Sequence, residues 1–167
     1  GGSATVHFPI WHQEIQDILV LKNNKGTEDN RVRKLDYSIQ ISKLFYERFI
    51  EDKEISLFSP HNVPNLFESF GTPDFDELYC RYELDESIPR TTIGAQELIM
   101  DLLKERSETG RIYIMNIDHC NEHSSFKDKV SMSNLCQEIT LPTEPIQHID
   151  AIDCLLYTSD AADDLGR

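Results

Sequence analysis

An amide, a thiol and a carboxylate stand at alternating positions near the end of the chain, at Asn134, Cys136 and Glu138. Leu135 and Gln137 separate them. If this stretch is extended, side chains two residues apart point to the same side, so the three polar groups share one face. Such a face could act on a substrate hydroxyl. An ordinary strand with a buried cysteine has the same pattern and, on the pattern alone, is favoured.

The sequence around Cys136 indicates which chemistry a functional thiol could perform. A nucleophilic cysteine needs a nearby cation that lowers the thiol pKa, and residues 130–141 contain no Lys, Arg or His. Glu138 would oppose thiolate formation by repulsion between like charges. A neutral S–H group suits hydrogen-atom transfer better than nucleophilic attack, and Glu138 could accept a proton from a substrate hydroxyl as a general base.

A second group of candidate ligands is Asp118, His119, Cys120 and His123. On a helix, His119 and His123 would share a face and could hold a metal ion with their neighbours. The second Cys/His pair of a zinc site is absent, so we expect a polar loop without metal and keep the metal site as an alternative. Cys80 falls within an amphipathic helix pattern and is expected to be a structural thiol.

The composition excludes several classes of function. The chain has 167 residues, with 16 basic and 30 acidic side chains and a formal net charge of −14. This balance argues against nucleic-acid binding, which needs clustered Lys and Arg. No apolar run approaches the roughly 18 residues of a membrane span, and the first residues show no signal-peptide pattern. The cysteines have no CxxC spacing, and we interpret them as thiols of a cytoplasmic protein.

Segments with strand and helix periodicity alternate around these candidate residues. Ser42 is placed to cap one helix, and Leu103 is expected on the buried face of another. Strands separated by helices are typical of a mostly parallel sheet, so we predict a single α/β domain. Strands are predicted at residues 5–8, 35–41, 55–58 and 111–117, helices at 12–21, 43–51, 64–70, 75–84 and 92–107, turns at 23–26 and 71–73, a polar loop at 118–129 and extended chain at 133–141.

The last residues continue no pattern set up before them. The run Cys-Leu-Leu-Tyr-Thr-Ser at 154–159 matches the translation of a common transposase-type sequencing adapter. We therefore expect residues 1–153 to be a partial domain and residues 154–167 to be a non-native tail. Cys154 is accordingly excluded from the candidate sites.

Several motifs together resemble those of a known enzyme family. The run Ser-Asn-Leu-Cys-Gln-Glu-Ile-Thr-Leu-Pro-Thr at 133–143 resembles the catalytic finger loop of class I ribonucleotide reductase large subunits. The resemblance runs in order through residues 1–150, and the Asn-Leu-Cys-x-Glu form is that of the aerobic class. Further matching runs are ATVHFPIWH at 4–12, LVLKNN at 19–24, LFSP at 57–60, ERSETGRIY at 105–113 and NIDHCN at 116–121.

The resemblance implies a role for each residue of the triplet. Cys136 matches the cysteine that becomes a transient thiyl radical and takes the ribose 3′-hydrogen. Glu138 matches the base that accepts the proton of the 3′-hydroxyl, and Asn134 matches the amide that holds the ribose hydroxyls. With Leu135 between them, these residues would form the substrate-binding part of the loop.

The resemblance also implies the fold and the molecular context. The chain would be part of the family's ten-stranded α/β barrel, and Gly1, Gly2 and Ser3 match the end of the loop that relays effector identity to the substrate site. The implied oxidoreductase reduces ribonucleoside diphosphates to 2′-deoxyribonucleoside diphosphates for DNA synthesis. The parent would be a cytoplasmic, allosteric homodimer that binds ATP or deoxynucleotide effectors. It would take a radical from a metal-containing small subunit and electrons from thioredoxin or glutaredoxin, with no cofactor on this chain and no membrane or nucleic-acid partner.

Departures from the family pattern keep other functions open. The redox cysteine pair, the radical-transfer tyrosines and the regulatory region of the family have no match here, so we expect the chain alone not to turn over. One alternative is a non-catalytic acidic α/β interaction module with a structural Cys136. Another is a small metal protein that uses His119, Cys120 and His123.

Overall fold

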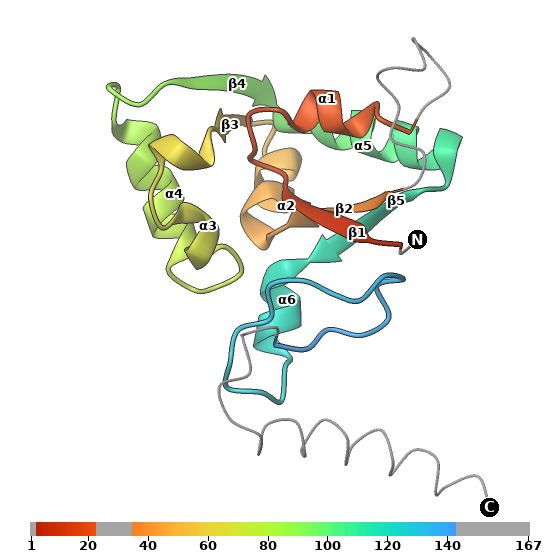
Figure 1. The fold of residues 1–167 in the computed structure, drawn as a ribbon. Helices are drawn as coiled ribbons and strands as arrows, with labels where there is room; N and C mark the ends of the chain where they lie inside the picture. The colour runs from red at the N-terminus through yellow and green to blue at the C-terminus, as the bar shows by residue number, and fades with distance from the viewer. Residues whose placement is uncertain (1–2, 23–34, 143–167) are drawn as a thin grey trace, which may run out of the picture.

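The computed structural model describes residues 3–22 and 35–142. Three predictions lie outside the described residues: the roles of Gly1 and Gly2, the turn at 23–26 and the tail at 154–167. Strands and helices alternate along the described chain, as the sequence predicts (Figure 1). In order, the elements are β1 (Thr5–Pro9), α1 (Ile15–Leu19), β2 (Asp36–Ile41), α2 (Lys43–Ile50), β3 (Glu54–Phe58), η2 (Pro60–Asn62), α3 (Leu66–Ser69), α4 (Phe75–Leu84), β4 (Arg90–Gly94), α5 (Ala95–Thr109), β5 (Ile112–Asn116) and α6 (Ile117–Glu122).

A parallel sheet with the strand order β1-β2-β5 forms the centre of the fold. Ile39 of the central strand lies opposite Phe8 on one side and Ile114 on the other. Helices α1, α2 and α5 lie on one side of this sheet, and the segment that follows α6 lies on the other (Figure 1). Parallel strands joined through helices confirm the predicted α/β class.

The second sheet contains a strand, β4, that the sequence pattern does not predict. β3 pairs antiparallel with β4, where the helix predicted at 92–107 was expected to begin. Thr91, Thr92 and Ile93 are β-branched and favour this pairing, so α5 begins only at Ala95. Gly110 ends α5 in the left-handed conformation, with a φ of 64°.

Two further expectations about helices need correction. Leu103 is 44% exposed, so it does not belong to the buried face of α5. Ser42 occupies the N-cap position of α2, but its side chain makes no capping hydrogen bond. The Asp118 carboxylate instead accepts the Lys43 amide at 2.6 Å. A carboxylate from α6 therefore performs the capping expected of the local serine.

An aromatic cluster joins α2 to α4. The Phe45 ring lies 6.2 Å from that of Phe70 and 6.0 Å from that of Phe75, between centroids. The ring of Tyr79 lies 5.4 Å from that of Phe45. Tyr79 is fully buried, and its hydroxyl donates to the Ser56 carbonyl at 2.7 Å and accepts the Ser56 amide at 2.8 Å. The cluster therefore ties β3 to both helices.

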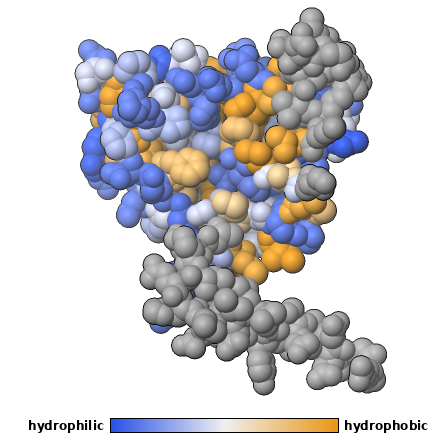
Figure 2. Space-filling view, in the orientation of Figure 1, coloured by the Kyte–Doolittle hydropathy of each residue, from blue (hydrophilic) through white to orange (hydrophobic). Residues whose placement is uncertain are grey.

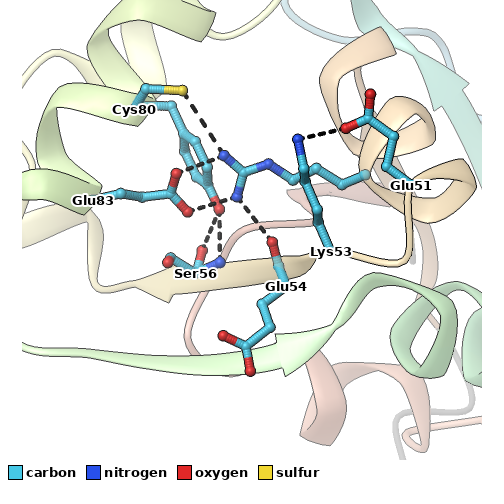
Figure 3. A network of polar contacts seen from close by, with 8 residues as sticks. Glu51, Lys53, Glu54, Ser56, Cys80 and Glu83 are labelled. Atoms are coloured by element: carbon cyan, nitrogen blue, oxygen red, sulfur yellow. Dashed lines mark hydrogen bonds and ion pairs between the residues drawn. The ribbon is translucent and has the colours of Figure 1, made fainter.

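Arg48 closes this cluster with a mostly buried ion pair (Figure 3). Its guanidinium donates to both carboxylate oxygens of Glu83, at 2.6 and 2.5 Å, and to the Glu54 carbonyl at 2.9 Å. It also lies over the Tyr79 ring, 5.0 Å from the centroid. The hydrogen bonding with Glu83 is the main cause of the raised pKa of Arg48. This bidentate pair fixes α2 against α4.

The surface mixes hydrophilic and apolar side chains (Figure 2). Ile50 and Leu84 are among the most exposed apolar residues, at 78% and 83% exposure. In the part of the chain that the structure describes, no helix is both long and apolar enough to cross a membrane.

Candidate functional site

The candidate triplet lies on a turn, where the sequence predicts an extended chain. The Gln137 amide donates to the Asn134 carbonyl, and the Asn134 amide donates to the Ile139 carbonyl, each at 3.1 Å. The Asn134 side-chain oxygen also accepts the Ile139 amide at 3.0 Å. Gln137 has a φ of 61°, in the left-handed region. The prediction of extended chain at 133–141, with alternating faces, is therefore wrong.

The turn nevertheless exposes the two side chains with reactive groups. Cys136 and Glu138 are exposed. Leu135, which lies between Asn134 and Cys136 in the sequence, is 39% exposed. Cys136 is thus a free, accessible thiol and not the buried cysteine of an ordinary strand. Asn134 is half-buried because its side chain closes the turn.

Gln137 points in the opposite direction, towards the sheet. Its side-chain oxygen accepts the Ser38 hydroxyl at 2.7 Å, and its side-chain nitrogen donates to the Ile114 carbonyl at 2.6 Å. Ser38 belongs to β2 and Ile114 to β5, so one side chain connects the turn to two neighbouring strands.

Other polar side chains of β1 and β2 hold the loop by its backbone. The Thr5 hydroxyl donates to the Leu135 carbonyl at 2.6 Å, and the Gln40 amide donates to the Ser131 carbonyl at 2.7 Å. The Ser133 amide donates to Nε2 of His7 at 3.5 Å. Burial lowers the pKa of His7, which favours the neutral ring that can accept this bond. The face of the sheet opposite α1, α2 and α5 is therefore polar and covered by the loop.

The base of the loop is held by a residue of α6, a helix that replaces part of the predicted polar loop at 118–129. The Asn121 side chain donates to the carbonyls of Ile117 and Val130, at 2.9 and 3.0 Å. Its oxygen accepts the Val130 amide at 2.8 Å. Val130 is fully buried. Asn121 thereby fixes the point from which the loop crosses the sheet.

The alternative metal site does not form among residues 3–22 and 35–142. The rings of His119 and His123 lie edge to face, 5.8 Å apart between centroids. No group of three or more His, Cys, Asp or Glu side chains in the described chain is placed to hold a metal ion. Burial, together with the Asp118 carboxylate, raises the pKa of Cys120. Cys80 is exposed, with its sulfur 3.8 Å from a guanidinium nitrogen of Arg48, and is not packed in the core as a structural thiol would be.

A cavity of about 530 Å³ lies at the opposite end of the loop, at the start of α2. Acidic and basic side chains both line the cavity. The pKa of Asp76 is raised, mainly by burial and secondarily by repulsion from Glu47 and Asp118. Gly71 lines it too, and a Cβ there would lie only 2.7 Å from Cγ1 of Ile117. None of the triplet residues reaches this cavity. Its charged side chains are Lys43, Asp76, Asp118, Glu122, Lys127, Asp128 and Lys129.

The arrangement presents an exposed thiol and an exposed carboxylate, one residue apart, from a turn docked on a rigid sheet. A thiol can donate a hydrogen atom and a carboxylate can accept a proton, so the turn exposes one group suited to each of these steps. The residues that hold it were not predicted. The polar positions in the β2 pattern, Ser38 and Gln40, were the signal for them, because buried polar side chains need hydrogen-bond partners.

Comparisons with known proteins identify a family and several relatives of this chain. Residues 1–156 match the family described as "Ribonucleotide reductase, barrel domain". The chain is 54% identical over 155 residues to the ribonucleoside-diphosphate reductase subunit alpha of Haemophilus influenzae, covering 90% of this chain and 20% of that protein. It is 49% identical over 151 residues to the reductase 1 subunit alpha of Escherichia coli K12, covering 87% and 20%. The subunit alpha of Enterobacteria phage T4 is 45% identical over 157 residues, covering 90% and 21%.

These relatives are much longer than the chain, which spans about a fifth of the length of each of them. The family match, by contrast, runs through nearly the whole chain, including β1, β2, β5 and the docked turn. The chain therefore belongs to the ribonucleotide reductase barrel-domain family.

Proposed function

We propose that the complete protein is the large subunit of a class I ribonucleoside-diphosphate reductase, an oxidoreductase that makes 2′-deoxyribonucleoside diphosphates. The observation that carries this proposal is the exposed turn with Cys136 and Glu138, docked on the sheet of a chain from this family. A non-catalytic interaction module with a structural Cys136 is less well supported, because the thiol is exposed on a turn and forms no disulfide among the described residues.

The three residues of the turn divide the reaction between them in this proposal. A sulfur radical on Cys136 takes the hydrogen atom from ribose C3′, so an S–H bond forms as the C–H bond breaks. Glu138 accepts the proton of the 3′-hydroxyl. Asn134, with the backbone around Leu135, holds the ribose hydroxyls. A metal-containing small subunit would supply the oxidising equivalent that generates the radical.

The molecular context is also part of the proposal. Ser3 lies two residues before Thr5, whose hydroxyl contacts the Leu135 carbonyl, and this proximity supports Gly1, Gly2 and Ser3 as the end of a loop that signals effector identity. The parent would be a cytoplasmic homodimer with ATP or deoxynucleotide effectors and with thioredoxin or glutaredoxin as reductant. The division of the chain at residue 153 stays a prediction.

The test of this function is Glu138→Gln in the full-length subunit. The substitution keeps the shape of the side chain and removes the base, so turnover should fall by about 10²–10⁴-fold. Binding of the diphosphate should change much less, since the amide still forms hydrogen bonds. Glu86→Gln, an exposed glutamate elsewhere in the chain, serves as the matched control.

Reduction of a ribonucleoside diphosphate and its binding are measured on the same preparations. Lost turnover with retained binding supports the proposed base. Normal or increased turnover of the Glu138→Gln subunit would contradict it. An increase is what a nucleophilic Cys136 predicts, because a neighbouring negative charge opposes formation of a thiolate and the substitution removes that charge.

A further inference from the structure

We propose that Gln137, together with Ser38, is a positioning residue that holds the turn so that Cys136 and Glu138 face the same substrate. This inference rests on the proposed function, because it assigns a task to residues that do not themselves touch the reacting atoms. It concerns a side chain that the triplet pattern placed on the face away from the chemistry.

The side chain of Gln137 is fixed at both polar atoms of its amide group. Gln137 stands between Cys136 and Glu138, and its side chain ends in two short hydrogen bonds, to the Ser38 hydroxyl and to the Ile114 carbonyl. The two partners belong to adjacent strands of the sheet. A side chain held at both ends of its amide group by two strands cannot rotate without breaking a bond, so the backbone on either side of Gln137 is fixed as well.

Gln137 has a backbone conformation that is unusual for glutamine. Its φ of 61° lies in a region that glycine and asparagine adopt readily and that other residues seldom occupy. A turn that needed only this conformation would be better served by glycine. The side chain of Gln137 therefore contributes something that offsets the conformational cost, and its two hydrogen bonds are that contribution.

The two partners of Gln137 require a side chain that can both donate and accept a hydrogen bond. The Ser38 hydroxyl donates and the Ile114 carbonyl can only accept. The side chain at position 137 must therefore accept a hydrogen bond at one atom and donate one at another. Glutamine satisfies both. An ionised glutamate would lack the donor, and methionine, which has nearly the same length, would lack both functions. Ser38 is itself fully buried, so its hydroxyl depends on this partner.

The experiment compares two substitutions of Gln137 in the full-length subunit. Gln137→Met keeps the length of the side chain and the unfavourable left-handed backbone conformation, but it removes both side-chain hydrogen bonds. Gln137→Gly removes the hydrogen bonds and also relieves the backbone. Gln96→Met is the matched control, because Gln96 also donates to a backbone carbonyl, that of Phe49 at 3.2 Å, on the helical side of the sheet.

The expected result is a fall in kcat of about tenfold in both Gln137 variants with little change in KM, because a small displacement of reacting groups slows the chemical step. Adding Ser38→Ala to Gln137→Met should cause no further loss, since the two substitutions break the same hydrogen bond. The Gln96→Met subunit should keep its kcat. Normal kcat in Gln137→Gly overturns the inference, because it would show that only the backbone conformation matters.

Hydrogen exchange at the amides of Gln137 and Ile139 gives a readout that does not depend on turnover. We expect faster exchange in Gln137→Met than in the unsubstituted protein and no change in Gln96→Met. Unchanged exchange in Gln137→Met would contradict the inference that the Gln137 side chain holds the turn. An unsubstituted subunit without reductase activity overturns the proposed function instead, and the exchange data alone then decide for or against Gln137.

Discussion

Two regions of the molecule are held together by different means. The body around Tyr79 combines packed aromatic rings with the bidentate pair between Arg48 and Glu83. The loop from Val130 to Ile139 is instead held mainly by single hydrogen bonds from polar side chains of the sheet and of α6. The body buries its ion pair and rings, whereas the loop leaves Cys136 and Glu138 in solvent.

The two kinds of interaction serve different purposes: one stabilises the body, and the other holds a loop that exposes side chains to solvent. Packed rings and a desolvated ion pair resist local opening but leave no group free for a ligand. Individual hydrogen bonds fix the direction of the loop at a smaller gain in stability, typically about 1 kcal/mol each. The fold therefore places the exposed thiol of Cys136 on the region held by weaker interactions, which the sheet supports.

The largest effect is expected in the body. Arg48→Met removes the cation and leaves the Glu83 carboxylate without its partner in a largely buried site, which should cost about 3 kcal/mol. Protection of the β3 and α4 amides against hydrogen exchange measures this cost. Arg81→Met is the control, because Arg81 lies in α4 with Glu83 and its pair with Glu77 at 2.7 Å is exposed and should contribute less than about 1 kcal/mol. Equal losses in the two variants would contradict the importance of burial.

A smaller and more local effect is expected in the loop. Gln40 is buried and donates to the Ser131 carbonyl, so Gln40→Met leaves this carbonyl without its donor at a cost of about 1 kcal/mol. Exchange of the amides between Val130 and Gln137 should accelerate about fivefold, while β3 keeps its protection. A loss of protection that spreads equally to β3 would show that the two regions open together.

The smallest effect is a dependence of loop docking on pH. Burial lowers the pKa of His7 below its usual value of 6.5, so the folded protein disfavours the protonated ring. The contribution of the neutral His7 ring to the stability of the folded state is therefore complete above pH 6.5. It is lost as the pH falls through the lowered pKa of the folded protein. The neutral ring also accepts the Ser133 amide, and protonation ends this bond.

We therefore expect weaker protection of the Ser133 amide at mildly acid pH, after correction for the intrinsic exchange rate. His7→Gln should remove this dependence. His12→Gln should retain it, although burial lowers the pKa of His12 as well, because His12 accepts the Glu14 amide and not the loop. A pH dependence that survives in His7→Gln would assign it to another group.

Most strands of the two sheets are predictable from the sequence, whereas β4 and α6 are not. The strands β1, β2, β3 and β5 follow from alternating or continuous apolar residues, which local sequence records directly. β4 was missed because Thr91, Thr92 and Ile93 run straight into a strong helix pattern, and only pairing with β3 separates the two. The helix α6 was missed because its residues are mostly polar.

The sequence identifies the residues of the candidate site but does not predict the turn on which they lie. Cys136 and Glu138 stand out by type and spacing, and the structure leaves both exposed, although the pattern alone favours a buried cysteine. The turn could not be predicted, because it depends on contacts between residues far apart in the chain. Ser38 and Gln137, for example, are separated by 99 positions. Local pattern contains no information about such a bond.

The most direct test of the central claim is the reductase activity of Cys136→Ser in the full-length subunit. Serine keeps the size and polarity of the side chain, but its O–H is a far poorer hydrogen-atom donor. Cys80→Ser is the control, since Cys80 is also an exposed free thiol but lies in the body of the molecule. We predict that Cys136→Ser abolishes diphosphate reduction with nucleotide binding retained, while Cys80→Ser remains active. Appreciable reduction by the Cys136→Ser subunit would contradict the account.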